Sequence, residues 1–277
     1  MAKILDYYET IVGGPVMRKG KFGIGRWLPV SLTIVTLITL AACTPMPSTV
    51  APAATAPGVT LEASSVPPTD FTTAVAKVMP SIVVIEVEIV TQTAAGQPTV
   101  QPAAGSGWVV DANGLIVTNN HVVEGAQTIT ITLADGRKFT ATEVQTNAAE
   151  DLAVVKIDAQ NLQAATIGDS SKLKMGQPLA VIGNALDLGT RVTGGLVSLL
   201  DVSINFPNNQ TASHLIETDA AINPGNSGGV LITTAGGVVG IVNAGLSDPR
   251  IDPEAFGYAI PINGAMPIIN QLISQMP

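Results

Sequence analysis

Four kinds of residue are scarce in this sequence of 277 residues, which has one cysteine, two histidines, 4% aromatic residues and 12% charged residues. A single cysteine excludes a disulfide framework and a multi-cysteine zinc site. Two histidines argue against a histidine-rich metal site, so we expect no metal. A charged fraction well below the usual ~25% excludes a disordered polyelectrolyte and a coiled coil.

Small and aliphatic residues dominate what remains. Hydrophobic residues make up 46% of the chain, and with so few aromatics they predict a core of Val, Ile, Leu and Ala. The 27 glycines, together with many Val, Ile and Thr residues, indicate short strands and tight turns. The length of 277 residues allows one large domain or two small ones.

The charge is uneven along the chain. Residues 1–42 contain five of the 13 Lys and Arg residues but only two of the 21 Asp and Glu residues, so the rest of the chain is acidic. An acidic body repels phosphate backbones, and we therefore expect no nucleic acid among its partners.

The N-terminal segment has the pattern of a signal peptide over residues 1–42. A basic cluster at 18–26 precedes an apolar run at 27–42. That run is shorter than the ~20 residues of a membrane span and has the length of a signal-peptide core. Asp6 and Glu9 lie ahead of the basic cluster, which is unusual for such a segment, so translation starts at Met1 or at Met17.

The apolar run ends in the sequence LAAC, whose last residue is Cys43. This sequence resembles the bacterial lipobox, in which the cysteine is lipidated and becomes the first residue of the mature chain. The resemblance implies a lipid anchor in a bacterial membrane and an extracytoplasmic location in the cell envelope; the alternative is an uncleaved N-terminal anchor. Residues 43–70 are rich in Pro, Ala and Thr and predict an extended tether rather than a core.

The remaining residues, 71–277, predict one all-β region with a short helix at each end. Helical spacing covers 71–79 and 263–276, and the polar stretch 91–104 has the composition of a short loop. The absence of helices between the strands indicates a barrel or sandwich pair. The β-rich runs are 82–90, 107–110, 115–118, 128–133, 138–144, 153–157, 178–182, 190–200, 214–218, 230–233, 238–242 and 257–260.

The strongest chemical signal is the segment GNSGG around Ser227. Glycines on both sides of a serine allow a tight turn and a close approach of a substrate backbone. In such a turn the N–H groups of Gly225, Asn226 and Ser227 can converge to form an oxyanion hole. The alternative is a glycine-rich hairpin without catalytic function.

A nucleophilic serine needs a base, and the chain offers only His121 and His214. His121 follows an apolar strand and can be presented to a cleft, whereas we assign His214 a structural role. Asp151 precedes a second apolar strand, from which its carboxylate can orient the imidazole. These three residues, His121, Asp151 and Ser227, are the candidate catalytic residues.

Three segments, TNNHVV, DLAVVKI and TDAAINPGNSGG, occur in this order and contain these residues. The chain thereby resembles the HtrA/Deg branch of the trypsin-like serine proteases over roughly residues 71–265. The resemblance implies two six-stranded antiparallel β-barrels, at about 71–165 and 172–262, followed by a helix at about 263–276. It implies hydrolysis of peptide bonds in unfolded or damaged proteins through an acyl-enzyme, a reaction that needs no metal and no cofactor.

The resemblance also implies the substrate pocket. The residue six positions before the nucleophile is Ala221, and neither it nor Ile222 can pair with a basic side chain, so we expect small aliphatic residues at the P1 position of the substrate. The strand at Asn243 and Ala244 forms the pocket wall and pairs with the substrate backbone, and Tyr258 closes the other side.

Two features depart from the family. Its members usually carry PDZ domains after the protease, and we expect none here because residue 277 follows the last helix directly. Val202 stands where many members have an arginine that relays activation. The family also implies a homotrimer assembled near the start of the protease region, where Phe71 is the only aromatic residue.

Two other functions stay open. The chain is a catalytically silent binding or chaperone module on the same scaffold, or it is a solute-binding lipoprotein. The first alternative is weakened because no candidate catalytic residue is missing, and the second because the strands do not alternate with helices.

Overall fold

The computed structural model describes residues 70–92, 97–184, 189–205, 211–246 and 256–276. The predicted signal peptide, lipidated Cys43 and tether lie outside these residues. Across the ranges that are described, every helix is too short or too polar to span a bilayer.

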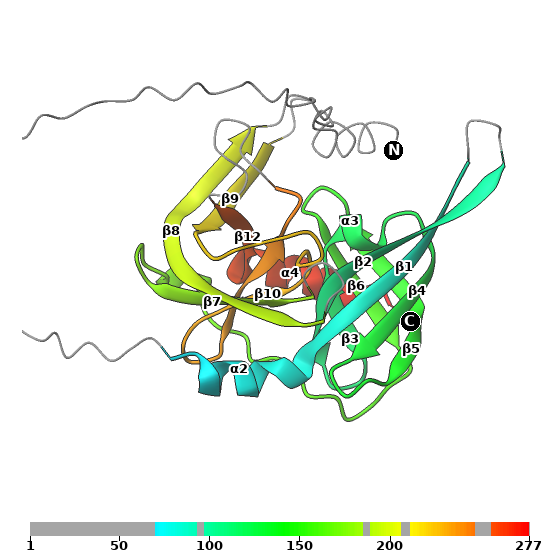
Figure 1. Cartoon of the computed structure of the whole chain (residues 1–277), viewed down its shortest axis with the longest axis horizontal. Coiled ribbons are helices and arrows are strands. Elements are labelled where there is room, and N and C mark those ends of the chain that lie inside the picture. The colour runs from blue at the N-terminus through cyan, green and yellow to red at the C-terminus, as the bar shows by residue number, and fades with distance from the viewer. Residues whose placement is uncertain (1–69, 93–96, 185–188, 206–210, 247–255, 277) are drawn as a thin grey trace, which may run out of the picture. The chain divides into compact units, whose positions relative to one another are not determined.

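Twelve strands form two closed antiparallel barrels (Figure 1). The first has the order β1-β2-β3-β6-β5-β4 and the second the order β10-β11-β12-β9-β8-β7. This arrangement confirms the predicted fold class. The strands of the first barrel are β1 (Ile82–Gln92), β2 (Pro98–Asp111), β3 (Leu115–Thr118), β4 (Ala126–Leu133), β5 (Lys138–Asn147) and β6 (Leu152–Ile157). Those of the second are β7 (Pro178–Gly183), β8 (Arg191–Asn205), β9 (Thr211–Thr218), β10 (Val230–Ile232), β11 (Val238–Asn243) and β12 (Gly257–Pro261).

Side-chain alternation explains how the barrels form their cores. In β4 the sequence AQTITITL places Ile129, Ile131 and Leu133 on the buried face and the intervening threonines on the other. Such alternation with period two defines a strand that is buried on one side. A third apolar cluster joins the barrels, because Val117 and Val154 of the first pack with Ile182 and Ile241 of the second.

Helices are few and lie at the ends of the described region or in its connections. Helix α2 (Thr72–Val78) continues into the 3-10 turn η1 (Met79–Ser81), and α4 (Ile262–Ser274) follows β12 directly. Ala265 and Ile269 of α4 are fully buried in the cluster between the barrels. The other helical elements are the single-turn helix α3 (Asn120–Val123) and the 3-10 turn η2 (Ser170–Lys172).

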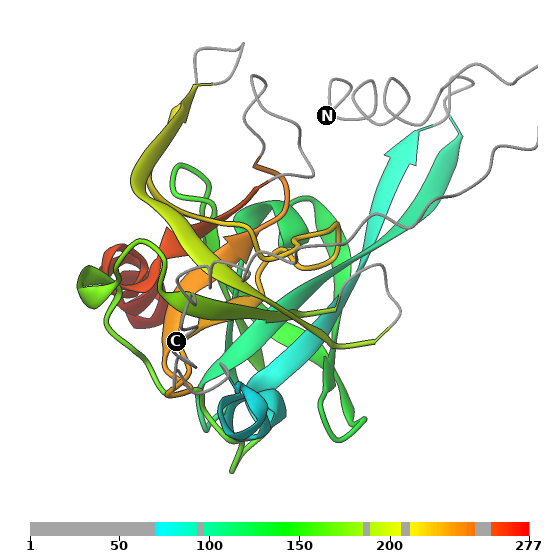
Figure 2. The same cartoon turned by 60° about the vertical axis from the view of Figure 1, so that its left-hand side comes forward.

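Two hairpins are longer than the sequence predicted. The stretch 91–104, predicted as a short loop, largely belongs to β1 and β2, which pair from Ile82↔Trp108 out to Gln92↔Pro98. Figures 1 and 2 show this hairpin projecting from the first barrel. The prediction was wrong because the outer residues are mostly exposed, so no apolar alternation marks them as a strand. Likewise β8 continues beyond residue 200 to Asn205, and β9 begins at Thr211.

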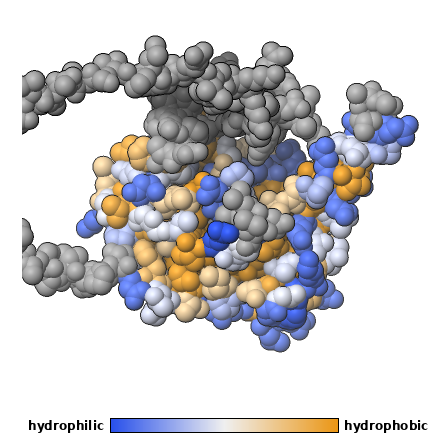
Figure 3. All heavy atoms as spheres, viewed as in Figure 1, coloured by the Kyte–Doolittle hydropathy of each residue, from blue (hydrophilic) through white to orange (hydrophobic). Residues whose placement is uncertain are grey.

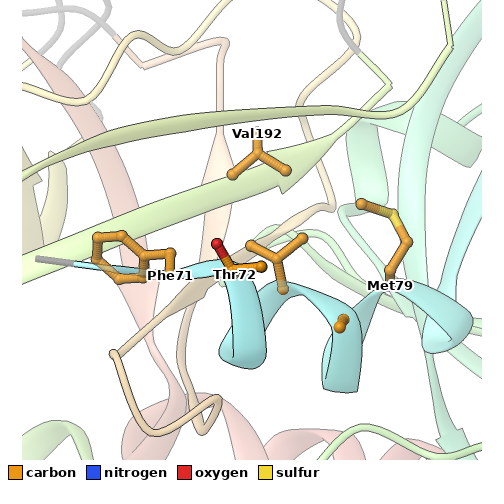
Figure 4. Close-up of a pocket in the computed structure, with 6 residues that line it drawn as sticks. Phe71, Thr72, Met79 and Val192 are labelled. Carbon is orange, nitrogen blue, oxygen red and sulfur yellow. The ribbon is translucent and has the colours of Figure 1, made fainter.

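The surface mixes hydrophobic and hydrophilic residues (Figure 3). Hydrophilic residues gather at the lower right of that view, on the side where Figure 1 places β5. A groove of about 540 Å³ lies between α2 and the start of β8 and is lined by Phe71, Val75, Met79 and Val192 among others (Figure 4). Phe71 thus lines an apolar groove. The homotrimer that the family resemblance implies stays a prediction.

Candidate active site

Asp151 lies at the start of β6 and has a left-handed backbone, with φ at 53°. A residue other than glycine rarely adopts this conformation without support from its surroundings. Here the support is the side-chain amide of Asn119, which donates to the Asp151 carbonyl over 3.0 Å. Asn119 is itself fully buried at the end of β3. The main chain therefore presents the Asp151 carboxylate in one fixed direction.

Three donors converge on the Asp151 carboxylate. Its Oδ1 accepts from the backbone N–H of His121 over 2.9 Å, and its Oδ2 accepts from the His121 ring nitrogen Nδ1 over 2.7 Å. The side-chain amide of Asn243 donates to the same Oδ2 over 2.6 Å. Because Asn243 ends β11 of the second barrel, the acid of the first barrel is bonded to both barrels.

His121 occupies the single turn α3, between the buried side chains of Asn120 and Val122. The His121 side chain itself is 38% exposed, so its outer ring edge can meet a substrate. Bonding of Nδ1 to a carboxylate assigns the ring proton to Nδ1 and leaves Nε2 as an acceptor. This is the tautomer that a general base needs.

Ser227 is buried, and its Oγ accepts from the backbone N–H of Ala244 over 3.2 Å. Among the described residues no hydrogen bond joins Ser227 to His121. The two segments are nevertheless neighbours, because Gly105 lies between them: a Cβ on Gly105 would be 2.6 Å from Val122 and 3.4 Å from the Ser227 carbonyl oxygen. Bonds between a nucleophile and its base are often loose without substrate.

The turn before Ser227 leaves two N–H groups without an acceptor. Gly225 has φ at 94°, and the N–H of Asn226 donates to the Asn223 carbonyl over 3.0 Å. The Asn226 N–H, included in the predicted oxyanion hole, is therefore used inside the turn. Within the described part of the chain, the N–H groups of Gly225 and Ser227 bond to no protein acceptor. An anion at this turn would meet those two donors.

Gly228, directly after the nucleophile, has no room for a side chain. Its φ is 82°, and a Cβ there would lie 2.2 Å from both the Ser106 carbonyl oxygen and the Thr118 hydroxyl. The Gly228 N–H donates to the Val242 carbonyl over 2.9 Å. Glycine at this position lets the nucleophile's loop pack directly against the first barrel.

The predicted pocket residues divide between two environments. Ala221 is exposed and Ile222 half-buried, and the Ile222 side chain fills the space beside Gly257, where a Cβ would lie 2.4 Å from its Cδ1. Ala220 and Ala259 belong to the same apolar cluster as Ile222. This surface is apolar and carries no charge.

The side chains of Asn243 and Tyr258 point elsewhere. Asn243 bonds to Asp151, as described above. Tyr258 packs with Ile204 and Leu215 in a separate cluster, and its hydroxyl donates to Glu217 over 3.2 Å. The backbone of Tyr258 pairs with that of Asn243 in the ladder between β11 and β12, and its place in the substrate pocket stays a prediction.

His214, for which we expected a structural role, lies on β9 and bonds through Nδ1 to Asp201 over 2.6 Å. Both residues have left-handed φ values, and their side chains are 84% and 75% exposed. The pair joins β8 to β9 and has no contact with Asp151 or Ser227.

Two residues position the site in a way that the sequence did not predict: Asn119, and Asn243, which was expected only in the wall of the substrate pocket. A buried asparagine at the end of an apolar strand is a detectable signal, because burial of an amide is costly without partners. The segments LIVTN and VVGIVN both show it. Their partner, however, is visible only in three dimensions.

The chain is similar to known proteins in both sequence and structure. A family sequence model described as a trypsin-like peptidase domain matches residues 105–241, which include His121, Asp151 and Ser227. The chain is 42% identical over 183 residues to a "Serine protease Do-like HtrA" of Bacillus subtilis (strain 168), covering 63% of this chain and 40% of that protein. It is 42% identical over 184 residues to the "Periplasmic serine endoprotease DegP" of Salmonella typhimurium, covering 65% and 37%.

Among solved structures, the "HtrA-type protease AlgW with decapeptide" is similar with a TM-score of 0.64 and 32% identity. That similarity covers 74% of this chain and 68% of the other. The chain spans about 40% of the length of the first of these curated relatives.

Proposed function

Because this chain belongs to the HtrA-type family of trypsin-like serine proteases, we propose that it is a serine endopeptidase of the cell envelope that cleaves unfolded or damaged proteins. The observation that carries the proposal is the Asp151–His121 pair, with Nδ1 bonded to Oδ2 over 2.7 Å. The glycine-bounded Ser227 lies on the neighbouring loop of the second barrel.

In the proposed reaction, Nε2 of His121 accepts the proton of the Ser227 hydroxyl as its oxygen attacks a peptide carbonyl carbon. The carbon–nitrogen bond then breaks, His121 gives the proton to the leaving amine, and water releases the acyl group from Ser227. Asp151 keeps the ring in the Nδ1–H tautomer and stabilises the imidazolium. The bond from Asn243 supports this role by fixing the carboxylate.

The N–H groups of Gly225 and Ser227 are the proposed oxyanion hole. Each such donor is worth roughly 3 kcal/mol in the transition state of acyl transfer. The unused donors in the turn support this assignment, and the Asn223 bond of Asn226 leaves that third N–H out of it.

The proposed P1 preference is for small aliphatic side chains. It is supported by the uncharged surface of Ala221 and Ile222 and by the volume that Ile222 occupies beside Gly257. A lysine or arginine there would be desolvated without a partner, which is costly. The substrate backbone would lie along Asn243 and Ala244 and pair by strand addition.

The proposed location is extracytoplasmic, with Cys43 anchored to a membrane by lipid. Support comes from the sequence LAAC and from the word "periplasmic" in the name of the Salmonella relative. Labelled fatty acid should enter the full chain and should not enter Cys43→Ser, which should also leave the membrane fraction. Incorporation of label into Cys43→Ser would contradict the lipid anchor, and so would an unlabelled wild type.

Active-site labelling tests the endopeptidase. The full chain in detergent is treated with a fluorophosphonate, beside Ser227→Ala and, as a matched serine control, Ser274→Ala near the end of α4. We expect equal labelling of the wild type and Ser274→Ala, and none of Ser227→Ala. Labelling of Ser227→Ala at the wild-type level would refute Ser227 as nucleophile. A folded wild type that takes up no label would favour the catalytically silent binding module.

A further inference from the structure

Ser106 lies on β2, where the first barrel faces the loop that carries Ser227. Its side chain is completely buried, and its main chain pairs with Val84 of β1. A buried hydroxyl is costly unless its hydrogen bonds are satisfied. The partners that Ser106 uses therefore indicate what it does at this position.

Ser106 makes four hydrogen bonds outside the strand ladder, and two of them reach the nucleophile's loop. The hydroxyl donates to the Gly225 carbonyl over 2.7 Å, and the backbone N–H donates to the Ser227 carbonyl over 2.8 Å. In addition, the hydroxyl accepts from the Asn184 N–H over 2.7 Å, and the carbonyl accepts from the Thr118 hydroxyl over 2.7 Å. One residue of the first barrel thus contacts both ends of the segment Gly225–Ser227 of the second.

The bond to Gly225 is one of two that fix the peptide unit between Gly225 and Asn226. The carbonyl of Gly225 and the N–H of Asn226 belong to the same planar peptide, and both are bonded, to Ser106 and to Asn223. Glycine populates left-handed and right-handed backbone about equally, so Gly225 itself imposes little direction. With the peptide after it anchored, the N–H of Gly225 is held at φ 94°.

From this geometry we propose that Ser106 is a positioning residue for the oxyanion hole. Its hydroxyl fixes the Gly225–Asn226 peptide. Through the Gly225 Cα this sets the preceding peptide, whose Gly225 N–H meets the developing oxyanion, while the backbone N–H of Ser106 anchors Ser227. The inference deepens the proposed endopeptidase function and rests on it. Ser106 itself contacts no substrate.

The variant Ser106→Ala separates the two anchors. It removes the hydroxyl together with its bonds to Gly225 and Asn184, but the backbone N–H that bonds Ser227 remains. Because a donor aimed at the oxyanion acts mainly in the transition state, kcat should fall about tenfold to hundredfold while KM changes by less than about threefold.

If Ser106 had only a structural role, Ser106→Ala would lower thermal stability but would not lower kcat at nearly constant KM. Ser81→Ala is the matched control: Ser81 is also fully buried, and its hydroxyl donates to a backbone carbonyl, that of Val78, over 2.6 Å. Ser81 belongs to η1, outside the proposed active site. At equal folded fractions, Ser81→Ala should keep kcat within about threefold of the wild type.

Three further readouts distinguish the role in the oxyanion hole from other defects. A peptide aldehyde, which forms a tetrahedral adduct with the nucleophile, should bind Ser106→Ala more weakly by about the same factor as kcat falls. The pH midpoint of kcat should not move, because the Asp151–His121 pair is untouched. In the Ser227→Ala background, adding Ser106→Ala should leave the affinity for a non-cleavable peptide unchanged.

The proposal is overturned if Ser106→Ala and Ser81→Ala have equal kcat at equal folded fractions. It is also overturned if KM rises while kcat is constant, or if the pH midpoint of kcat shifts. A wild type that cleaves no peptide and takes up no fluorophosphonate would instead refute the endopeptidase function, so the two failures are distinguishable.

Discussion

Asn243 and Asp151 are 92 positions apart in the chain, and the Asn243 amide donates to Oδ2 of Asp151 over 2.6 Å. The same oxygen accepts from His121. The asparagine comes from the second barrel and the acid from the first. Because of this bond, the direction of the Asp151 carboxylate depends on how the two barrels pack.

Replacement of Asn243 by alanine should therefore lower kcat/KM. A hydrogen bond to a charged group contributes about 1.5–3 kcal/mol, which corresponds to roughly a tenfold to hundredfold loss if it acts in the transition state. The measurement is steady-state cleavage of a peptide with a small aliphatic P1 residue.

The matched control for this variant is Asn263→Ala, because the Asn263 amide also donates to a carboxylate, Asp169 Oδ1, over 2.8 Å, but at the start of α4. That variant should lose stability and keep its kcat/KM. Equal rates for the wild type and Asn243→Ala would show that the bond has no catalytic role.

Gly228 should tolerate no side chain. In Gly228→Ala the new methyl group would lie 2.2 Å from two oxygen atoms of the first barrel, so either the loop moves or the barrels separate. We expect proteolytic activity to be lost and the free energy of unfolding to fall by more than about 3 kcal/mol. Denaturant titration followed by circular dichroism measures the second quantity.

Gly136→Ala is the matched control, because it measures the backbone contribution to the loss of stability without the crowding. Gly136 has nearly the same φ, 85°, but a Cβ there meets no atom within 4 Å. Only the left-handed strain, about 1–2 kcal/mol, should appear, with activity intact. If the free energy of unfolding fell equally in Gly228→Ala and Gly136→Ala, the crowding at Gly228 would not contribute to the loss of stability.

The sequence predicted the fold class because short, apolar strands with glycine turns leave a strong local pattern. It also led to His121 and Asp151, since each follows or precedes an apolar strand in a characteristic segment. The structure joins these two by a hydrogen bond. The local pattern was sufficient to predict a strand wherever burial of one face makes apolar and polar residues alternate.

Two kinds of feature escaped this reasoning. The outer part of the β1–β2 hairpin is stabilised by its backbone ladder while most of its side chains face solvent, so residues such as Gln101 and Pro102 carry no strand signal. The bonds of Asn243 and Ser106 join positions that meet only after both barrels have packed. Neither partner could be identified from the spacing of residues along the chain.

Ile222 should determine the size of the P1 residue. In Ile222→Ala the space beside Gly257 opens, and peptides with Met or Phe at P1 should gain relative to those with Ala or Val. One or more methylenes in a pocket change discrimination by about 1–3 kcal/mol, so the ratio of kcat/KM values should shift about tenfold to hundredfold.

A matched control for this change is Ile273→Ala, which shortens another half-buried isoleucine on α4 and should leave the ratio of kcat/KM values unchanged. Mapping the cleavage sites in unfolded casein tests the same pocket with a natural protein substrate. Frequent cleavage after Lys or Arg by the wild type would contradict an uncharged pocket.

Asp169 should make the fold sensitive to acid. Hydrogen bonds from Ser171, Asn263 and Lys172 hold the pKa of its carboxyl well below the usual range. They tie η2 to the first turn of α4. A carboxyl with a lowered pKa in the folded state stabilises the fold above its unfolded pKa of about 3.9, and this contribution is lost as the pH falls toward the folded pKa.

Replacement of Asp169 by asparagine should accordingly lower the free energy of unfolding at pH 7, and the difference from the wild type should shrink as the pH falls from about 4 toward 2. Denaturant titrations of both proteins at pH 7, 5, 4 and 3 measure this difference. A difference that stays constant over the series would mean that the shape of the side chain, and not its charge, joins η2 to α4. A difference that grows on acidification would have the wrong sign for a lowered pKa and would contradict the assignment of these bonds to the ionised carboxylate.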